Sequence, residues 1–585
     1  MIVSGILWRN APKNVEYIDK LKRISQKYSN VNEDIINDRY LTIIAGKVSK
    51  NDFDNLRTEN GNILVGRIFN KASYEPIVNH QLANLNAEIL ANEWWGKYLF
   101  FSHSENESAF VLRDPTGQLP FFYHELRDGN IIFSSELCVL DDFLPIQPAY
   151  NWPYILSHIL YNNNSNSDQT VFEGISELPP GCLLEFDTKV HVKIGWNPLN
   201  YSNSKAFTSD DFIAVLNASL KAWHHSYDNL LLSFSGGLDS TALLHCLKDT
   251  KAENQTLRAI NFFHPKVRSS NELIYAQKIC KDLDIELIEL DIERALPFTP
   301  SRGTLPIKPN RPFPALTHMA LMEDVSEIID EYPSSLFING QGGDHIFLSN
   351  PPCSLILDHF LDKGFHGIKS QLDALTHYYR TTILQVLKAN FTEMLNVLFY
   401  NRSIVYKKHR ADWVTKEFYK VGQKQYMHPI YNTFPKTLRL GKASHLIEVD
   451  HGLASIALEL GDHNPVYSPL LYQPLLELAL SVPTYEMLKN GYDRYPIRES
   501  ISRTFNTDSV WRRSKGETTG IVQLGVKRNL EYVKMLCLEG RISKQGLIKK
   551  EKLEKEILSL SKGSTSSLWL LMNLISTEIF FEQWG

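Results

Sequence analysis

Short apolar segments separated by polar turns run through the first two hundred residues. Four of them have the length and the branched or aromatic side chains of β-strands: 40–45, 99–102, 109–112 and 131–134. Two longer stretches, 15–28 and 152–161, repeat their apolar positions at helical spacing. The pattern predicts an α+β layered domain over residues 1–200, followed by a polar linker at 200–205.

The pattern changes from residue 206, where apolar strands and helical stretches alternate. We expect strands at 230–234, 257–263 and 285–290, with helices at 240–247 and 273–283 between them. Such alternation is typical of a parallel sheet covered by helices. Beyond residue 350 the spacing is mostly helical, so residues 206–585 are predicted to form an α/β domain with a helical extension. The tail at 568–584 is expected to be an amphipathic helix docked on the core.

Composition narrows the class of protein. A hydrophobic content of 43% and a net charge of −5 are typical of a soluble globular protein and give no general attraction for nucleic acid or anionic membranes. The six cysteines are scattered without a CxxC pair, which argues against zinc and against a disulfide framework. No stretch of about 18 apolar residues is present, so we expect no membrane span and a cytoplasmic location.

The strongest chemical signal is the segment Ser-Phe-Ser-Gly-Gly-Leu-Asp-Ser at 233–240, which follows an apolar strand and opens a helix. A helix N-terminus offers free backbone N–H groups to an anion, and glycines let the backbone approach phosphate oxygens closely. The segment lacks the Gly-Lys-Ser/Thr of the Walker motif. We expect an ATP or pyrophosphate site made by Ser235, Gly236, Gly237, Leu238, Asp239 and Ser240.

A second segment, 337–344, again runs from a strand into glycines and then into an aspartate. Gly340 and Gln341 are expected to lie against the nucleotide. Asp239 and Asp344 are expected at the carboxyl ends of neighbouring strands, where ligands bind in open α/β sheets. Two carboxylates there are suited to Mg²⁺. The alternative for Asp344 is a turn residue that caps the next helix.

These motifs resemble known families. The segment 233–240 looks like the pyrophosphate loop of ATP pyrophosphatases, and the whole chain resembles the asparagine synthetase family through five segments in that family's order: 113–122, 133–136, 172–181, 469–470 and 511–515. The resemblance implies an N-terminal glutaminase-like (Ntn-type) layered domain and a C-terminal ATP pyrophosphatase-type domain. It also implies the use of ATP and Mg²⁺ to form an acyl-adenylate, with release of pyrophosphate and, after amide formation, AMP.

Lys515 resembles the family lysine that holds the departing pyrophosphate and the charge of the second step. A surface lysine is the alternative, with Arg513 in that role.

The chain departs from the glutamine-dependent members at two positions. They need Cys as residue 2, where this chain has Ile2, and an asparagine where it has Val65. We therefore expect a degenerate glutaminase-like domain that does not hydrolyse glutamine. In the synthetase domain Gln341 replaces a glutamate and His345 follows Asp344, which suggests that the acyl acceptor is no longer ammonia.

The segments 340–347 and 492–498 are most similar to those of lasso peptide cyclases. That resemblance implies adenylation of an Asp or Glu side chain in a ribosomal precursor peptide. Attack by the peptide's α-amine would then close a macrolactam, and a leader peptidase would be the partner that exposes this amine. Alternatives are a β-lactam synthetase, an asparagine synthetase that uses free ammonia, and a non-catalytic peptide-binding scaffold.

Four further residues are candidates on this interpretation. Asp493, Arg494 and Arg498 are expected either to clamp charges of the peptide or to form an internal ion-pair network. His345 is a candidate proton acceptor for the amine, with a packing role as the alternative. The proline-rich loop at 308–314 is expected either to overhang the cleft or to be a plain connector.

Overall fold

The computed structural model describes most of the chain. The described residues are 2–9, 13–28, 33–38, 40–46, 54–57, 62–82, 84–104, 107–161, 166–186, 189–202, 209–267, 270–303, 305, 307–399, 409–435, 437–454, 466–513, 516 and 518–585.

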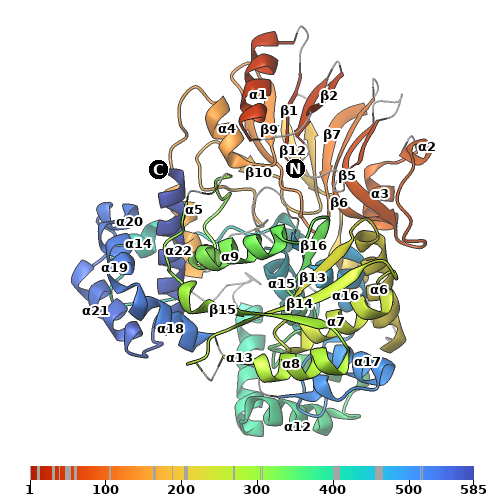
Figure 1. The fold of residues 1–585 in the computed structure, drawn as a ribbon, viewed down its shortest axis with the longest axis vertical. Coiled ribbons are helices and arrows are strands. Elements are labelled where there is room, and N and C mark those ends of the chain that lie inside the picture. Colours follow the sequence, from red (N-terminus) through yellow and green to blue (C-terminus); the bar gives the residue numbers. More distant parts are fainter. Residues whose placement is uncertain are drawn as a thin grey trace.

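Two antiparallel six-stranded sheets form the N-terminal part, which lies at the top of Figure 1. The first sheet has the order β10 (Ser176–Glu177), β8 (Phe122–Glu125), β9 (Ile131–Ser134), β1 (Ile2–Leu7), β3 (Leu41–Gly46) and β2 (Glu33–Asp38). The second has the order β12 (Val190–Ile194), β11 (Cys182–Phe186), β7 (Glu107–Arg113), β6 (Trp94–Ser104), β5 (Ile63–Asn70) and β4 (Asp54–Arg57). All four predicted strands of this region and both predicted helices are confirmed.

The two sheets pack face to face and helices cover their outer sides. Val3 and Ile43 from the first sheet share one apolar core with Val65 and Leu99 from the second. The outer face of the first sheet packs on α1 (Val15–Tyr28) and α4 (Leu137–Phe143), and the outer face of the second packs on α3 (Ala87–Glu93). The short α2 (Asn79–Leu82) and α5 (Trp152–Tyr161) complete this part. The predicted layered α+β architecture is therefore confirmed.

A five-stranded parallel sheet forms the centre of the C-terminal part. Its order is β15 (Glu286–Asp291), β14 (Thr256–Phe263), β13 (Asn229–Ser233), β16 (Ser335–Ile338) and β17 (Val466–Tyr467). Leu230 and Leu232 of β13 face α6 (Ser209–His224) and α7 (Leu238–Thr250), whereas Leu231 faces α9 (Met319–Asp330) on the other side. The helix α8 (Leu273–Asp282) links β14 and β15. The predicted parallel sheet is confirmed.

Helices dominate from residue 343 onward, as predicted. They are α10 (Gly343–Ile346), α11 (Leu355–Lys363), α12 (Ile368–Tyr379), α13 (Ile383–Phe399), α14 (Lys416–Val421), α15 (Leu440–Ala454), α16 (Gln473–Ser481), α17 (Tyr495–Phe505), α18 (Thr519–Arg528), α19 (Leu530–Glu539), α20 (Arg541–Lys544), α21 (Lys550–Ser561) and α22 (Leu568–Trp584). The tail is the docked core helix that was expected, but the prediction that this helix is amphipathic was wrong. All residues from 570 to 581 are buried, because α22 lies inside a layer of helices that includes α5 and α19.

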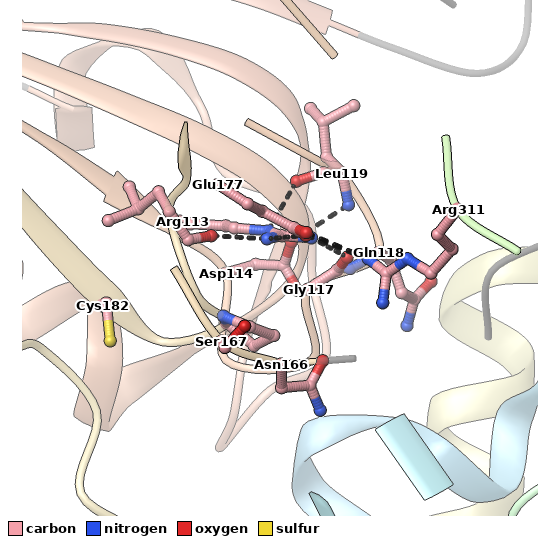
Figure 2. A network of polar contacts seen from close by, with 12 residues as sticks. Arg113, Asp114, Gly117, Gln118, Leu119, Asn166, Ser167, Glu177, Cys182 and Arg311 are labelled. Atoms are coloured by element: carbon pink, nitrogen blue, oxygen red, sulfur yellow. Dashed lines mark hydrogen bonds and ion pairs between the residues drawn. The ribbon is translucent and has the colours of Figure 1, made fainter. Parts of the chain in front are cut away.

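A buried ion network connects the N-terminal and C-terminal parts (Figure 2). Arg113 donates to Glu177 Oε1 at 2.8 Å and to the carbonyl oxygens of Gly117 and Leu119 at 2.7 and 2.9 Å. Arg311 approaches the same Glu177 oxygen at 3.0 Å from the C-terminal part. The Arg113 and Glu177 side chains are only 1% and 4% exposed. One carboxylate thus joins two guanidinium groups across the contact.

The proline-rich loop that carries Arg311 lies on this contact. Asn310 accepts from the backbone N–H of Leu137 at 2.8 Å and donates to Glu136 at 2.8 Å. Lys308 lies over the ring of Trp584 at 4.8 Å. These contacts favour the connector interpretation of the loop over a position above a cleft. Half of the predicted linker, residues 203–205, lies outside the described residues, so the division at residues 200–206 stays a prediction.

Candidate active site

The glycine segment forms a turn between β13 and α7. Gly236 has φ +73°, which a residue with a side chain rarely adopts, and Gly237 is the N-cap of α7. The Ser235 hydroxyl accepts from the backbone N–H of Gly237 at 3.2 Å, and the Ser240 hydroxyl donates to the Gly237 carbonyl at 3.3 Å. The turn therefore presents its backbone at the start of a 13-residue helix, the geometry that holds phosphate groups in other proteins.

Asp239 and Asp344 meet at the carboxyl edge of the sheet. β13 and β16 are direct neighbours, so the loops that follow them lie side by side as predicted. A Cβ atom added to Gly343 would lie 2.3 Å from Asp239 Oδ1, and one added to Gly340 would lie 3.1 Å from the backbone nitrogen of Ser240. The glycines of the second segment are thus what lets it pack against the first. The expected proximity of the two carboxylates is present.

Arg494 lies between these two carboxylates. Its Nη1 atom is 2.7 Å from Asp239 Oδ2 and 2.5 Å from Asp344 Oδ1, and its Nε atom donates to Asp493 at 3.0 Å. Burial by itself lowers the pKa of Arg494, but the three carboxylates outweigh it and raise the pKa above the ordinary value. The guanidinium is therefore charged and bound on three sides.

Arg498 and Asp493 extend this network away from the sheet. Arg498 Nη2 lies 2.9 Å from Asp493 Oδ1, and its Nε atom donates to the Asp493 carbonyl at 2.8 Å. Arg494 and Arg498 are each 5% exposed and Asp493 is 8% exposed. Of the two interpretations given from sequence, this burial favours the internal ion-pair network over contact with a peptide.

His345 directly follows Asp344 and lies against α15. Its Nδ1 atom is 3.2 Å from Glu448 Oε2, and His451 Nδ1 is 3.9 Å from the other oxygen of Glu448. Burial alone would raise the pKa of Glu448, but the hydrogen bond from His345 and the histidine charges outweigh it and lower that pKa. A carboxylate only accepts, so the Nδ1 atom of His345 carries a proton where it binds Glu448.

Gln341 and Asn339 shape the turn before Asp344. Asn339 Oδ1 accepts from the Gln341 backbone N–H at 3.1 Å and from the Ser468 hydroxyl at 2.8 Å. An amide at position 341 has no basic lone pair for a proton. Of the three side chains Asn339, Gln341 and His345, the imidazole of His345 is the one that can accept a proton.

Lys515 lies outside the described residues, so its role stays a prediction. Arg512, on one side of it, forms an ion pair with Glu272 and lies over the Tyr275 ring at 4.1 Å. Gly516, on the other side, donates its backbone N–H to Glu272 at 3.1 Å. Tyr275 in turn borders the phosphate turn, since its Cβ lies 3.4 Å from a Cβ added to Gly236.

Glu272, Tyr275 and Glu448 complete the surroundings of the site. From sequence, no role was assigned to Glu272 or Tyr275. Glu272 and Tyr275 flank the start of the helix after β14, and no local pattern marked them.

The N-terminal part has apolar side chains at the two positions where glutamine-dependent members of the family need a cysteine and an asparagine. Ile2 is 2% exposed and packs into the core with α1, and Val65 is fully buried between the two sheets. Neither side chain offers a nucleophile or a hydrogen-bond donor. That this domain does not hydrolyse glutamine stays a prediction.

A glycine turn at a helix N-terminus and two acidic residues thus lie together at the carboxyl edge of a parallel sheet, which is where ligands bind in open α/β proteins. The asparagine synthase family model matches residues 212–584, and a glutamine amidotransferase domain model matches residues 38–197. The chain belongs to the asparagine synthase family. Membership of this family implies the use of ATP. The resemblance recognised from sequence is thereby confirmed.

Among curated proteins, the chain is similar to the microcin J25-processing protein McjC of Escherichia coli, with 20% identity over 368 residues. The match covers 62% of this chain and 62% of the length of that relative. This similarity agrees with the resemblance to lasso peptide cyclases.

Two solved structures match smaller parts of the chain. One is the U34-tRNA thiolase NcsA of Methanococcus maripaludis, with 12% identity, a TM-score of 0.22, and 44% of this chain and 83% of that one covered. The other is the NH₃-dependent NAD synthetase of Campylobacter jejuni, with 17% identity, a TM-score of 0.21, and 40% of this chain and 100% of that one covered. TM-scores of this size carry no weight for fold or function.

Within the described residues, no helix is long and apolar enough to cross a membrane.

The residues present fit a divalent cation. One guanidinium nitrogen lies within 2.7 Å of an oxygen from each of Asp239 and Asp344, so a single positive centre can bind both carboxylates. Oxygen ligands of this kind are those that Mg²⁺ prefers, and it usually takes its other ligands from phosphates and water. The described residues contain no group of three or more His, Cys, Asp or Glu that could hold a metal by themselves.

Proposed function

We propose that this protein uses Mg²⁺ and ATP to adenylate a carboxylate of a peptide and then forms an amide with an amine of the same peptide. The product is a macrolactam, and the enzyme is a lasso peptide cyclase. The observation that carries the proposal is the meeting of Asp239 and Asp344 beside the phosphate-type turn, with His345, paired with Glu448, directly after Asp344.

In the first step, a peptide carboxylate oxygen attacks the α-phosphorus of ATP and pyrophosphate leaves. The turn at 235–240 binds the departing phosphates through its backbone N–H groups and the N-terminus of α7. Asp239 and Asp344 would hold Mg²⁺, which would neutralise triphosphate charge. Lys515 is proposed to stabilise the pyrophosphate and the charge of the second step.

In the second step, the peptide α-amine attacks the acyl-adenylate and AMP leaves. The attacking nitrogen must lose a proton, and Nε2 of His345 is the proposed acceptor. Glu448 fixes this tautomer because it binds the N–H at Nδ1. A positioned acid or base of this kind contributes about 10²–10⁴-fold to a rate.

The peptide substrate is proposed from the similarity to the microcin J25-processing protein, together with Gln341, which cannot act as a base for ammonia. A precursor peptide is the substrate on this proposal, and a leader peptidase is the partner that exposes its α-amine. A cytoplasmic location stays a prediction.

The helices from α11 to α15 and the inert N-terminal domain are proposed to hold the peptide before its ring closes. One of these helices, α12, lies beside the site. The Cβ atom of its His377 is 3.0 Å from a Cβ added to Gly491, which is close to Arg494 in sequence. If this is so, substitutions in the precursor far from the reacting ends change turnover. Unchanged ring closure and threading after such substitutions would show that these parts do not hold the peptide.

The test is a product analysis with purified protein, Mg²⁺, ATP and the leader-free core peptide encoded beside it. We expect AMP and pyrophosphate in equal amounts and a peptide lighter by one water, with none of these from Asp239→Ala. AMP formation only with a small amino acid would retain the synthetase and reject the cyclase. ADP, or no nucleotide turnover with any carboxylate, would reject the proposed chemistry.

A further inference from the structure

One guanidinium nitrogen occupies the position where two acidic residues of the proposed metal site converge. Asp239 follows β13 and Asp344 follows β16, whereas Arg494 is the N-cap of α17, 255 residues after Asp239. The oxygens of the two carboxylates lie 2.7 and 2.5 Å from the same Nη1 atom. Three separate segments therefore meet at one positive charge.

Arg494 is built into this position. Its backbone has φ +49°, in the left-handed region, and its side chain is 6% exposed. Asp493 binds its Nε atom at 3.0 Å and is itself bound by Arg498 at 2.9 Å. The backbone conformation and these contacts aim the guanidinium at the acidic pair and away from solvent.

The charges in the cluster are close to balance. Three carboxylates face two guanidinium groups, which leaves one net negative charge on five buried or half-buried side chains. Carboxylates so close together repel each other strongly in a low dielectric unless a cation lies between them. Some positive charge must therefore be present whether or not a metal is bound.

We propose that Arg494 is an internal counter-ion that binds Asp239 and Asp344 before the metal arrives and competes with Mg²⁺ for them. Without nucleotide, Mg²⁺ must displace the bound guanidinium and enter a site that already holds little net negative charge. A triphosphate changes this, because it brings new negative charge for both the metal and the displaced guanidinium. Arg494 thus makes metal binding depend on the nucleotide. This inference rests on the proposed metal site but not on the nature of the acyl acceptor.

Arg498 provides a matched comparison. It is as buried as Arg494 and belongs to the same network, but it bonds to Asp493 and to the carbonyls of Val510 and Arg512. If Arg494 acts by competition, its loss frees the metal site. The loss of Arg498 removes an equal charge one helical turn away without freeing Asp239 or Asp344.

The experiment measures Mn²⁺ binding to the full-length protein without nucleotide, from the electron paramagnetic resonance signal of free Mn²⁺. We expect Arg494→Gln to bind Mn²⁺ at least tenfold more tightly than the wild type. Arg498→Gln should bind it within about threefold of the wild type. Arg494→Lys, whose ammonium cannot reproduce the planar fork, should lie between the wild type and Arg494→Gln. Thermal unfolding of each variant shows that it is folded, and Arg494→Lys carries the test if Arg494→Gln is not.

Two results would overturn the inference. One is unchanged or weaker Mn²⁺ binding in both Arg494 variants, which would make Arg494 a fixed part of the fold or of the nucleotide site. The other is equal tightening in Arg494→Gln and Arg498→Gln, which would show a general effect of charge. Neither result depends on peptide turnover, so a failure here is separate from a failure of the cyclase proposal.

Discussion

At the scale of single residues, the acidic pair depends on a glycine. A methyl group at Gly343 would lie 2.3 Å from Asp239 Oδ1 and 2.9 Å from a Leu470 methyl group. We predict that Gly343→Ala moves Asp239 and lowers the rate of adenylation at least about tenfold. This corresponds to an activation free energy about 1.4 kcal/mol higher. Exchange of labelled pyrophosphate into ATP in the presence of the peptide measures this step.

Gly303→Ala is the control for that substitution. Gly303 has nothing within 4 Å of an added Cβ, so the exchange rate should stay within about twofold of the wild type. Equal rates in the two variants would mean that Asp239 does not have to sit where it does.

Glu448 separates the two chemical steps. It binds His345, which acts only in the second step of the proposal, so Glu448→Gln should leave pyrophosphate exchange within about twofold. Ring closure should fall about 10- to 1000-fold, and its pH profile should change, because the carboxylate no longer fixes the His345 tautomer. Rapid-quench analysis of AMP and cyclised peptide measures both steps. Glu486→Gln, of similar exposure and paired with Lys363, should change neither. An equal fall of exchange and closure would place Glu448 in substrate binding instead.

Local sequence could predict much at this scale, but not the partners of distant residues. The turn at 233–240 and Asp344 follow from strands that end in glycines. Arg494 could not be assigned to Asp239 from sequence, because 255 residues separate them and no periodicity connects them. The histidine beside Asp344 was visible, whereas its orientation by α15 was not.

At the scale of elements, the start of α20 is capped by a buried carboxylate from α22. Glu578 accepts from the backbone N–H groups of Arg541 and Ile542 at 2.8 and 2.9 Å and is 3% exposed. Burial raises the pKa of Glu578 to about 7, although these two hydrogen bonds act in the opposite direction. The folded protein therefore keeps a proton there that the unfolded chain releases near pH 4.5.

The sign of the pH dependence follows from this raised pKa. The contribution of Glu578 to stability is complete below about pH 4.5 and is lost as the pH rises to about 7, by about 3 kcal/mol for a shift of this size. We predict that Glu578→Gln removes this part of the pH dependence of the unfolding free energy, measured by urea titration. Glu582→Gln, an exposed position in the same helix, should keep it. Identical pH profiles for both variants would contradict the assignment.

The elements themselves were mostly predictable because their apolar spacing is strong. The strand β17 was not, since its two residues are too short for any period and it pairs with a strand over a hundred residues earlier. The burial of α22 on all sides was also missed, because it depends on which helices surround it.

At the scale of the whole molecule, buried charges connect the N-terminal part to the synthetase part. Glu177 binds Arg113 and Arg311 from opposite sides of the contact (Figure 2). Removal of its charge leaves two guanidinium groups without their carboxylate in a buried place. Such a loss costs about 3–5 kcal/mol.

We therefore predict that Glu177→Gln lowers the unfolding free energy by this amount, measured by denaturant titration. Glu185→Gln is the matched control, because its pair with Lys193 is on the surface and is worth about 0–1 kcal/mol. A Glu177→Gln variant as stable as the control would mean that the buried network does not hold the domains together.

The central claim, that a peptide carboxylate is activated by adenylation, has a direct isotopic test. The core peptide is labelled with ¹⁸O in its side-chain carboxylates, incubated with the protein, Mg²⁺ and ATP, and the nucleotide product is analysed by mass spectrometry. Attack of the carboxylate on the α-phosphorus followed by amide formation transfers one labelled oxygen to AMP, and the account predicts AMP with one ¹⁸O for each cyclised peptide. Unlabelled AMP, or ADP with the label in inorganic phosphate, would contradict it.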